Sequence, residues 1–336
     1  MRRAFLGLVA AVLVVPACWA QSTAAQSKFV PVNGAPIINR LLGALPPAPA
    51  VTAPSALSST APTASNGIAY NGGPIMDDAN GVNVYFIWYG DWSKDQLAQK
   101  VLVNLITHIG GSPYFNINTT YYSLEPGPNI NNPIKDRVVN AVHYMGNTTD
   151  NYSQGTSPSD QQVFLAVANA ITSGALPVDK NGVYFLLTSA DVNAQGYSEN
   201  FCAWHGNTGA GPQSIDGTDI KVSWVGNAAA LYAYNCIWNY QTTLSGSMGA
   251  DGMASLIAHE LEESVTDPDG TSWINLGNGF FGENADMCLA VFPGSYHSGS
   301  ASDPQPPDMK FGGIPYLIQE NWVNAKGGLC AIKWDD

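Results

Sequence analysis

The segment at residues 82–89 constrains the fold more than any other part of this chain. It reads Val-Asn-Val-Tyr-Phe-Ile-Trp-Tyr, a run of β-branched and aromatic side chains that is typical of a buried strand. Apolar runs at residues 183–188 and 220–225 predict two further buried strands. Buried strands point to a central sheet that other elements must cover.

Two segments have the spacing of helices that would cover such a sheet. Apolar residues recur at every fourth position from 97 to 109, after an N-cap at Ser93 and before the pair Gly110-Gly111. A second helix is predicted over residues 159–172, where apolar residues lie among alanines. Strands that alternate with helices predict an α+β (α/β-like) fold, with a single domain built on a central mixed sheet flanked by helices.

The N-terminus predicts export. Arg2 and Arg3 precede a short apolar stretch, and residues 17–20 read Ala-Cys-Trp-Ala, so residues 1–20 are interpreted as a signal peptide cleaved after Ala20. The alternative is a lipid anchor at Cys18 or retention in a periplasm. No segment reaches the ~20 apolar residues of a transmembrane helix.

The remainder divides into a leader and a folded part. Residues 21–66 are rich in Ala, Pro, Ser and Thr and are predicted to be a disordered leader, because they bury too little apolar surface to offset the entropy of ordering. Residues 67–336 are predicted to form the globular domain, with no linker inside it.

Charge and cysteine content narrow the partners and the compartment. The chain has 13 basic against 26 acidic residues, so it would repel phosphate backbones, and we expect no nucleic acid partner. Beyond Cys18 four cysteines remain, which predicts two disulfides in an oxidising compartment. Proximity in sequence favours the pairs Cys202–Cys236 and Cys288–Cys330.

The strongest chemical signal is a helix capped by Asp251 and ended by Pro268, which disfavours helical backbone at the preceding residue. His259 and Glu263 are four residues apart and therefore share one face of this helix, with Glu260 one step round. The pattern is that of the HExxH zinc helix with Glu in place of the second His.

Zinc chemistry needs a third ligand. Glu283 is the first choice and Asp286 the second, about twenty residues beyond the helix, as in zincins whose third ligand is a downstream Glu. We therefore predict a zinc site at His259, Glu263 and Glu283 with Glu260 as general base. The alternatives are a solvated acidic surface, or a structural calcium ion held by Glu263, Asp267, Glu283 and Asp286.

Other histidines carry weaker signals. His205 follows Cys202 and is interpreted either as a ligand or acid–base group or, more simply, as a buttress of a disulfide loop. His108 and His143 are assigned to amphipathic helices, and His297 to a polar loop. The nucleophile elbow, phosphate loop and dinucleotide fingerprint motifs are absent from the sequence, which argues against serine-hydrolase and nucleotide chemistry.

Several motifs resemble the phosphate-induced protein 1 family, also called the EXORDIUM family. They are Tyr-Asn-Gly-Gly-Pro-Ile at 70–75, Val-Asn-Val-Tyr-Phe-Ile-Trp-Tyr-Gly-Asp-Trp at 82–92, Phe-Cys-Ala-Trp-His-Gly at 201–206, Trp-Val-Gly-Asn at 224–227 and Gly-Ala-Asp-Gly-Met at 249–253. The resemblance implies an extracellular or cell-wall protein and supplies no enzymatic reaction. Plant members have small and apolar residues where this chain reads His-Glu-Leu-Glu-Glu at 259–263, so the resemblance is closer to microbial members with an intact metal-like helix.

Two functional hypotheses follow. The first is a secreted zinc-dependent hydrolase, a metallopeptidase, acting on a peptide or a cell-wall polymer. The second is a non-catalytic extracellular or cell-wall-associated protein that binds carbohydrate or a partner, with a structural calcium site. The abundant Trp and Tyr residues suit sugar stacking in the second hypothesis, although core packing also explains them.

Overall fold

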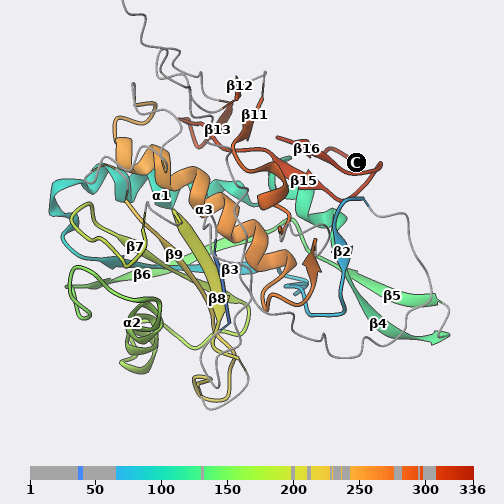
Figure 1. The fold of residues 1–336 in the computed structure, drawn as a ribbon, viewed down its shortest axis with the longest axis horizontal. Coiled ribbons are helices and arrows are strands. Elements are labelled where there is room, and N and C mark those ends of the chain that lie inside the picture. The colour runs from blue at the N-terminus through green and yellow to red at the C-terminus, as the bar shows by residue number, and fades with distance from the viewer. Residues whose placement is uncertain are drawn as a thin grey trace, which may run out of the picture.

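A six-stranded sheet covered by α-helices on both faces forms the centre of the molecule (Figure 1). The computed structural model describes residues 37–40, 66–129, 132–197, 201–209, 213–227, 229, 236, 243–275, 282–293, 296–297 and 308–336. Helices α1 (Gln96–Ile109) and α3 (Met248–Thr266) lie on one face of the sheet, and α2 (Asp160–Thr172) lies on the other. The predicted α+β fold with a central mixed sheet is confirmed.

The sheet has the strand order β1-β8-β9-β7-β3-β6, with a parallel part and an antiparallel edge. Strands β6, β3, β7 and β9 run parallel to one another, whereas β8 pairs antiparallel with both β9 and β1. The bounds are β1 (Ile37–Arg40), β3 (Val82–Tyr89), β6 (Val142–Asp150), β7 (Gly182–Thr188), β8 (Ala203–Asn207) and β9 (Lys221–Val225). All residues of β7, β8 and β9 are buried, because helices cover both faces.

The three predicted strands correspond to β3, β7 and β9, whereas β6 and β8 were not predicted. Exposure alternates along β6, which is an edge strand with few apolar residues. The assignment of His143 to a helix is therefore wrong, since it lies on β6. His297 lies on the short strand β12 (Tyr296–His297) rather than in a loop.

The helix starts follow their capping residues. Asp95, not Ser93, caps α1, because its side chain accepts a hydrogen bond from the main-chain N–H of Ala98 at 3.0 Å. Ser93 lies in a short 3-10 helix, η1 (Trp92–Lys94). The predicted boundaries of α2 are confirmed: Ser159 forms a capping box with Gln162, and the helix ends at Thr172.

The remaining elements of the described chain lie outside the central sheet and are mostly short. They are β2 (Ala69–Tyr70), β10 (Trp273–Ile274), η2 (Phe115–Thr120), β4 (Tyr122–Asn129), β5 (Asn132–Arg137), η4 (Asp286–Cys288), β11 (Val291–Phe292), β12, β13 (Met309–Phe311), β14 (Ile314–Tyr316), β15 (Asn321–Val323) and β16 (Leu329–Ala331). The 3-10 helix η4 matters most for function, because it holds Asp286 beside α3.

Two disulfides link Cys202 to Cys236 and Cys288 to Cys330, as predicted. The first precedes β8 by one residue, and the second joins the end of η4 to β16. Both bonds therefore anchor segments that carry residues of the site described below.

The predicted signal peptide, including Cys18, lies outside the described residues. So does the predicted leader, except for Asn66 and for β1, which pairs with β8. Among the described helices, none combines the length and the apolar character that a membrane crossing needs.

Candidate metal centre

Helix α3 carries the centre of the site and is buried on all sides. Apart from Met248 and Asp251, all of its residues are buried, including His259, Glu260, Glu262 and Glu263. It packs against α1 and against strands β8 and β9. Charged side chains are costly to bury without a partner, so each of these residues needs a compensating group beside it.

The ends of α3 are set by local capping. Ser247 is the N-cap, and its hydroxyl accepts a hydrogen bond from the N–H of Ala250 at 3.2 Å. The predicted cap, Asp251, lies instead in the first turn and accepts from the N–H of Leu244 at 2.7 Å. The C-terminal end at Thr266, before Asp267, agrees with the prediction from Pro268.

His259 and Glu263 face a common point together with Asp286. His259 Nε2 lies 2.9 Å from Glu263 Oε1 and 3.5 Å from Asp286 Oδ1. The Glu263 carboxylate is held in place because its Oε1 accepts a hydrogen bond from the Asp286 N–H at 3.2 Å. These three side chains supply one nitrogen and two oxygens within 4.8 Å of one another.

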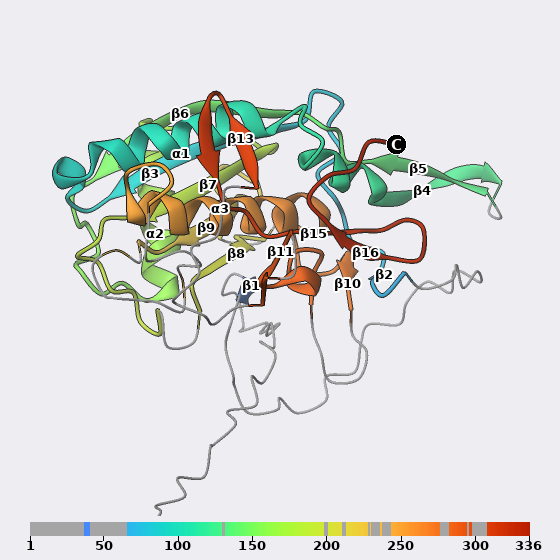
Figure 2. The ribbon, with the colours of Figure 1, turned by 90° about the horizontal axis from the view of Figure 1, so that it is seen from above.

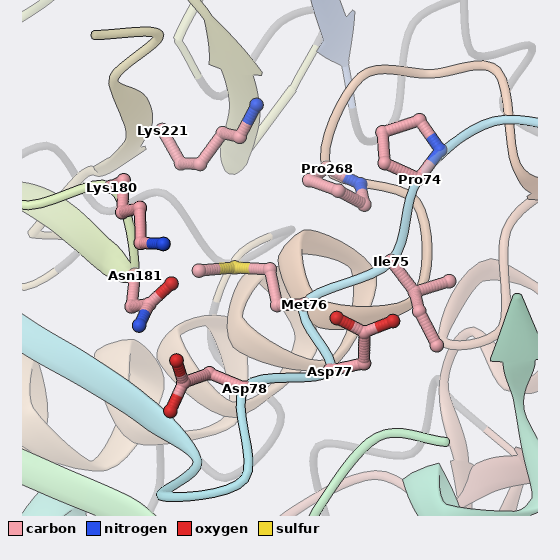
Figure 3. Close-up of a pocket in the computed structure, with 9 residues that line it drawn as sticks. All are labelled: Pro74, Ile75, Met76, Asp77, Asp78, Lys180, Asn181, Lys221 and Pro268. Carbon is pink, nitrogen blue, oxygen red and sulfur yellow. The ribbon is translucent and has the colours of Figure 1, made fainter. Parts of the chain in front are cut away.

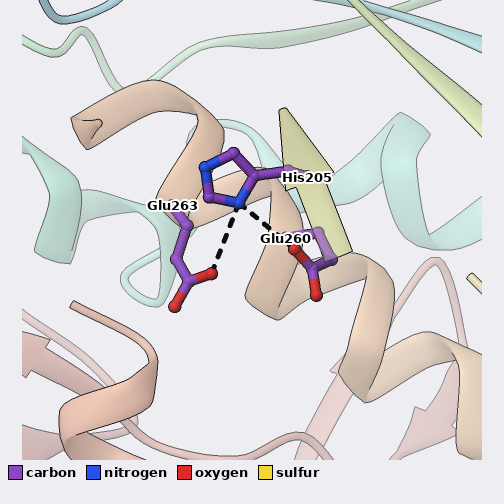
Figure 4. Close-up of side chains that lie close together, drawn as sticks. All are labelled: His205, Glu260 and Glu263. Carbon is purple, nitrogen blue, oxygen red and sulfur yellow. Dashed lines mark hydrogen bonds and ion pairs between the residues drawn. The ribbon is translucent and has the colours of Figure 1, made fainter. Parts of the chain in front are cut away.

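The other side of Glu263 faces His205, which β8 presents to α3. His205 Nδ1 lies 3.3 Å from Glu260 Oε2 and 3.5 Å from Glu263 Oε2 (Figure 4). Its second ring nitrogen, Nε2, lies 3.5 Å from Glu283 Oε1 and 3.4 Å from the main-chain oxygen of Asp267. Glu263 therefore stands between two histidines, with one carboxylate oxygen toward each.

We call this group the buried cluster. It comprises His205, His259, Glu260, Glu263, Asp267, Glu283 and Asp286, and none of these residues exposes more than 7% of its surface. Within the described residues, the ion-pair partners of Glu260, Glu263 and Asp286 are histidines alone. The cluster thus concentrates negative charge where water is excluded.

The pKa values show how strongly these charges interact. Burial raises the pKa of Glu260 to about 7, and burial together with the Glu263 charge raises that of Asp286 to about 6. Burial opposes the charged form of both histidines, yet the neighbouring carboxylates outweigh it and raise the pKa of His205 to about 10 and that of His259 well above its usual value. The carboxylates of the cluster therefore favour a positive charge beside them, either as protons on the histidines or as a bound cation.

Several polar atoms of the cluster are suited to a metal ion. Within the described part of the chain, neither ring nitrogen of His259 makes an aligned hydrogen bond, and Glu260 Oε1 and Asp286 Oδ1 also have no hydrogen-bond partner. His259 Nε2 therefore lies close to Glu263 without an N–H aimed at it. Atoms that converge without bonding to one another are what a metal site requires, so these residues could hold a metal ion.

Glu262 belongs to the same helix but not to the cluster. Its Oε2 accepts a hydrogen bond from the Tyr114 hydroxyl at 3.2 Å, and burial raises its pKa well above the usual value. Its Oε1 has no hydrogen-bond partner within the described residues, but Glu262 forms no ion pair with a histidine there, and a proton is sufficient to compensate it.

The structure brings together most of the residues that the sequence singled out. His259, Glu260 and Glu263 lie in the cluster, and Asp286, the second choice, is the carboxylate beside His259. Glu283 is also in the cluster, but its Oε1 faces His205.

Sequence reasoning gave His205 too small a role. The only local signal was its place beside Cys202, and its partners are more than fifty residues away along the chain. Asp267, assigned only to the calcium alternative, accepts hydrogen bonds from the N–H groups of Thr271 and Ser272, both at 2.6 Å.

A separate pocket of about 260 Å³ opens beside the end of α3 (Figure 3). Pro268 lines it on one side, and Asp77, Asp78 and Lys221 contribute charges. Lys221 also pairs with Asp219 at 2.5 Å. No residue of the buried cluster lines this pocket, which is therefore a neighbouring feature.

The comparisons with known proteins identify the family. The family model described as the phosphate-induced protein 1 conserved region matches residues 68–303. The chain belongs to this family. The match covers five of the six strands of the central sheet, α3 and all seven residues of the buried cluster, so the resemblance carried by the sequence motifs is confirmed.

Curated relatives agree with the family model. The chain is similar to Protein EXORDIUM-like 3 of Arabidopsis thaliana, 29% identical over 285 residues, which cover 76% of this chain and 80% of the relative. It is similar to Protein EXORDIUM-like 5 of the same plant, 28% identical over 61% of this chain and 59% of the relative. Protein PHOSPHATE-INDUCED 1 of Nicotiana tabacum is 25% identical over 65% of this chain and 70% of the relative. No solved structure matches the chain.

Proposed function

We propose that this protein is an exported zinc-dependent hydrolase of the metallopeptidase kind. One observation carries the proposal: His259 and Glu263, one turn apart on α3, converge with Asp286 from η4 without hydrogen-bonding to His259. One nitrogen and two carboxylate oxygens are a zinc ligand set that leaves a coordination position for water or substrate. Bound there, zinc would polarise a carbonyl group and acidify water.

Glu260 is the proposed proton acceptor. Its Oε2 faces His205 Nδ1 at 3.3 Å, which fixes the side chain, while Oε1 makes no hydrogen bond within the described residues. Oε1 is thus free to take a proton from water and to deliver it to a leaving group. His205 acts on Glu260 as a positioning residue in this scheme.

The proposed role of Glu260 can be tested in the zinc-loaded protein with a panel of peptides. Glu260→Gln should lower kcat about 10²–10⁴-fold, the usual contribution of a general base, while the zinc that depends on His259 is retained. Glu262→Gln is the matched control, because it makes the same substitution at a neighbouring buried side chain of α3 that faces Tyr114 and lies outside the cluster. Equal turnover by Glu260→Gln and the unmodified protein would exclude this mechanism.

A structural cation in a non-catalytic extracellular protein is the second candidate, and the near-complete burial of the cluster favours it. Calcium would suit the oxygens of Glu263, Asp267, Glu283 and Asp286. Bound metal with no cleavage of peptides or cell-wall polymers would support this candidate over the hydrolase.

Export is supported by the charged and apolar N-terminus and by the two disulfides, which persist in oxidising compartments. Protein recovered from the culture medium should begin at Gln21, which mass spectrometry would show. An intact N-terminus on the external protein would contradict cleavage after Ala20.

A further inference from the structure

We propose that the buried cluster holds a second divalent cation, and that Glu263 bridges the two ions. The first ion is the zinc at His259, Glu263 and Asp286, so this inference rests on the proposed function. The second lies between His205, Glu260 and Glu263, which form an independent set of ligand atoms within 4.8 Å of one another.

The distances around His205 suit metal ligands better than ion pairs. A hydrogen bond between a charged nitrogen and a carboxylate is about 2.7–2.9 Å long. His205 Nδ1 instead lies 3.3 Å from Glu260 Oε2 and 3.5 Å from Glu263 Oε2. Two ligand atoms on one tetrahedral zinc ion, each about 2.1 Å from the metal, lie about 3.4 Å apart.

The two carboxylate oxygens of Glu263 are divided between the two sets. Oε1 faces His259 Nε2 at 2.9 Å, and Oε2 faces His205 Nδ1 at 3.5 Å. A carboxylate that presents one oxygen to each of two histidines has the arrangement of a bridging ligand. Two ions joined in this way lie about 3.5–4 Å apart in hydrolytic two-metal sites.

The surroundings of His205 are those of a ligand histidine. Its Nδ1 faces the proposed ion, while Nε2 lies near the carboxylate of Glu283 and the main-chain oxygen of Asp267. Metal-bound histidines usually donate their other ring N–H to such an oxygen, which fixes the orientation of the ring. Glu283 would therefore orient His205 rather than bind the first ion directly.

Charge balance favours two ions over one. The cluster contains five carboxyl groups, and a single divalent cation leaves Glu260 and Glu283 beside His205 in a buried site. A second divalent ion would neutralise two more charges and allow His205 to be neutral, as a metal ligand must be. Glu260 then binds through Oε2, and its Oε1 keeps the role proposed above.

The number of zinc ions per chain tests the inference. The mature protein is saturated with zinc, freed of excess by desalting and analysed for metal by mass spectrometry. We expect two zinc ions per chain, one in His205→Gln, and one or none in His259→Gln, since loss of the first ion weakens the bridge. His108→Gln is the matched control and should keep two, because His108 lies on α1 and bonds to the Asn104 carbonyl.

X-ray absorption of the unmodified zinc protein gives a measurement that requires no variant. A zinc–zinc signal at about 3.5–4 Å is expected for the bridged pair. One zinc per chain that is unchanged by His205→Gln, with no metal–metal signal, would overturn the second site and leave the proposed function intact. Absence of zinc from the unmodified protein would overturn both.

Discussion

Helices α1 and α3 lie side by side on the same face of the sheet, yet they are built in opposite ways (Figure 2). Helix α1 is amphipathic: it buries apolar residues such as Val101 and Leu105 and exposes its polar side to water. Helix α3 is buried on all sides and carries four ionisable residues within five positions, from His259 to Glu263. One helix is stabilised by apolar contact, whereas the other needs compensation for its charges.

The difference between the two helices distinguishes residues that serve packing from residues that serve function. An amphipathic helix recovers free energy from every apolar group that it buries, so the design of α1 is sufficient for folding. Burial of Glu260 and Glu263 in α3 works against folding unless a proton or a cation compensates them. A sequence that retains such residues in the core does so for the chemistry they provide, and a divalent cation is the compensation that their geometry fits.

Removal of the metal should have the largest effect on stability. It acts on the buried charges of α3 and leaves the apolar contacts of α1 unchanged. Without a cation, the carboxylates of the cluster repel one another, and structural zinc sites contribute on the order of 10 kcal/mol. That contribution is comparable to the free energy of unfolding of an ordinary domain, which is about 5–15 kcal/mol. Chelation should therefore unfold the protein or lower its Tm strongly in a thermal melt followed by circular dichroism.

Zinc added back after chelation is the control and should restore the original transition. An unchanged Tm after complete metal removal, verified by elemental analysis, would show that protons alone compensate the cluster. The contrast between α1 and α3 would then concern solvation only and not metal binding.

A core substitution in α1 should have the next largest effect without touching the metal. Leu105 is fully buried, and Leu105→Ala should cost about 2–5 kcal/mol through lost contacts and the cavity left behind. Urea denaturation measures this loss, and elemental analysis should find the metal content unchanged. The matched control is Leu97→Ala on the same helix, where 45% of the side chain is exposed and the expected change is within about 0.5 kcal/mol. Loss of metal in Leu105→Ala would mean that the two helices are not independent.

The sequence predicted those parts of the fold that depend on local patterns. Strand β3 was evident from its density of β-branched and aromatic residues, and the end of α3 from Pro268. Strand β6 was missed because half of its residues face water and few are apolar. Strand β8 was missed because it is short and contains Gly206 and Asn207, which rarely signal a buried strand.

The sequence could predict only those parts of the site whose residues lie close together along the chain. His259 and Glu263 are one helical turn apart, so their proximity follows from the period of the helix. Asp286 and Glu283 were both candidates, and nothing in the sequence shows which of them faces His259. His205 reaches the cluster because β8 pairs with β9 under α3, an arrangement that no spacing along the chain encodes.

Asp308 shows what a partly buried carboxylate does where a proton is sufficient. It lies outside the cluster, just before β13, and both of its oxygens accept from the Ile318 N–H, at 3.1 and 3.3 Å. Burial raises its pKa to about 7. Unlike Glu260 and Glu263 of α3, it has no histidine ion pair within the described residues, so protonation is its means of compensation.

Asp308→Asn should therefore produce a small, pH-dependent effect. The unfolded-state pKa of Asp is about 3.9, so the contribution of Asp308 to folding is fully present below pH 4 and is lost as the pH rises toward 7. Asn is neutral throughout, and the stability of the variant relative to the unmodified protein should rise by about 1 kcal/mol between pH 4 and pH 7, less than three pKa units would give because water reaches part of the side chain. Urea denaturation of both proteins at several pH values measures the difference, in which loss of metal at low pH cancels. A difference that stays constant with pH would mean that Asp308 is compensated as a charge, and that a carboxylate in this fold can stay ionised without a cation of the kind proposed for α3.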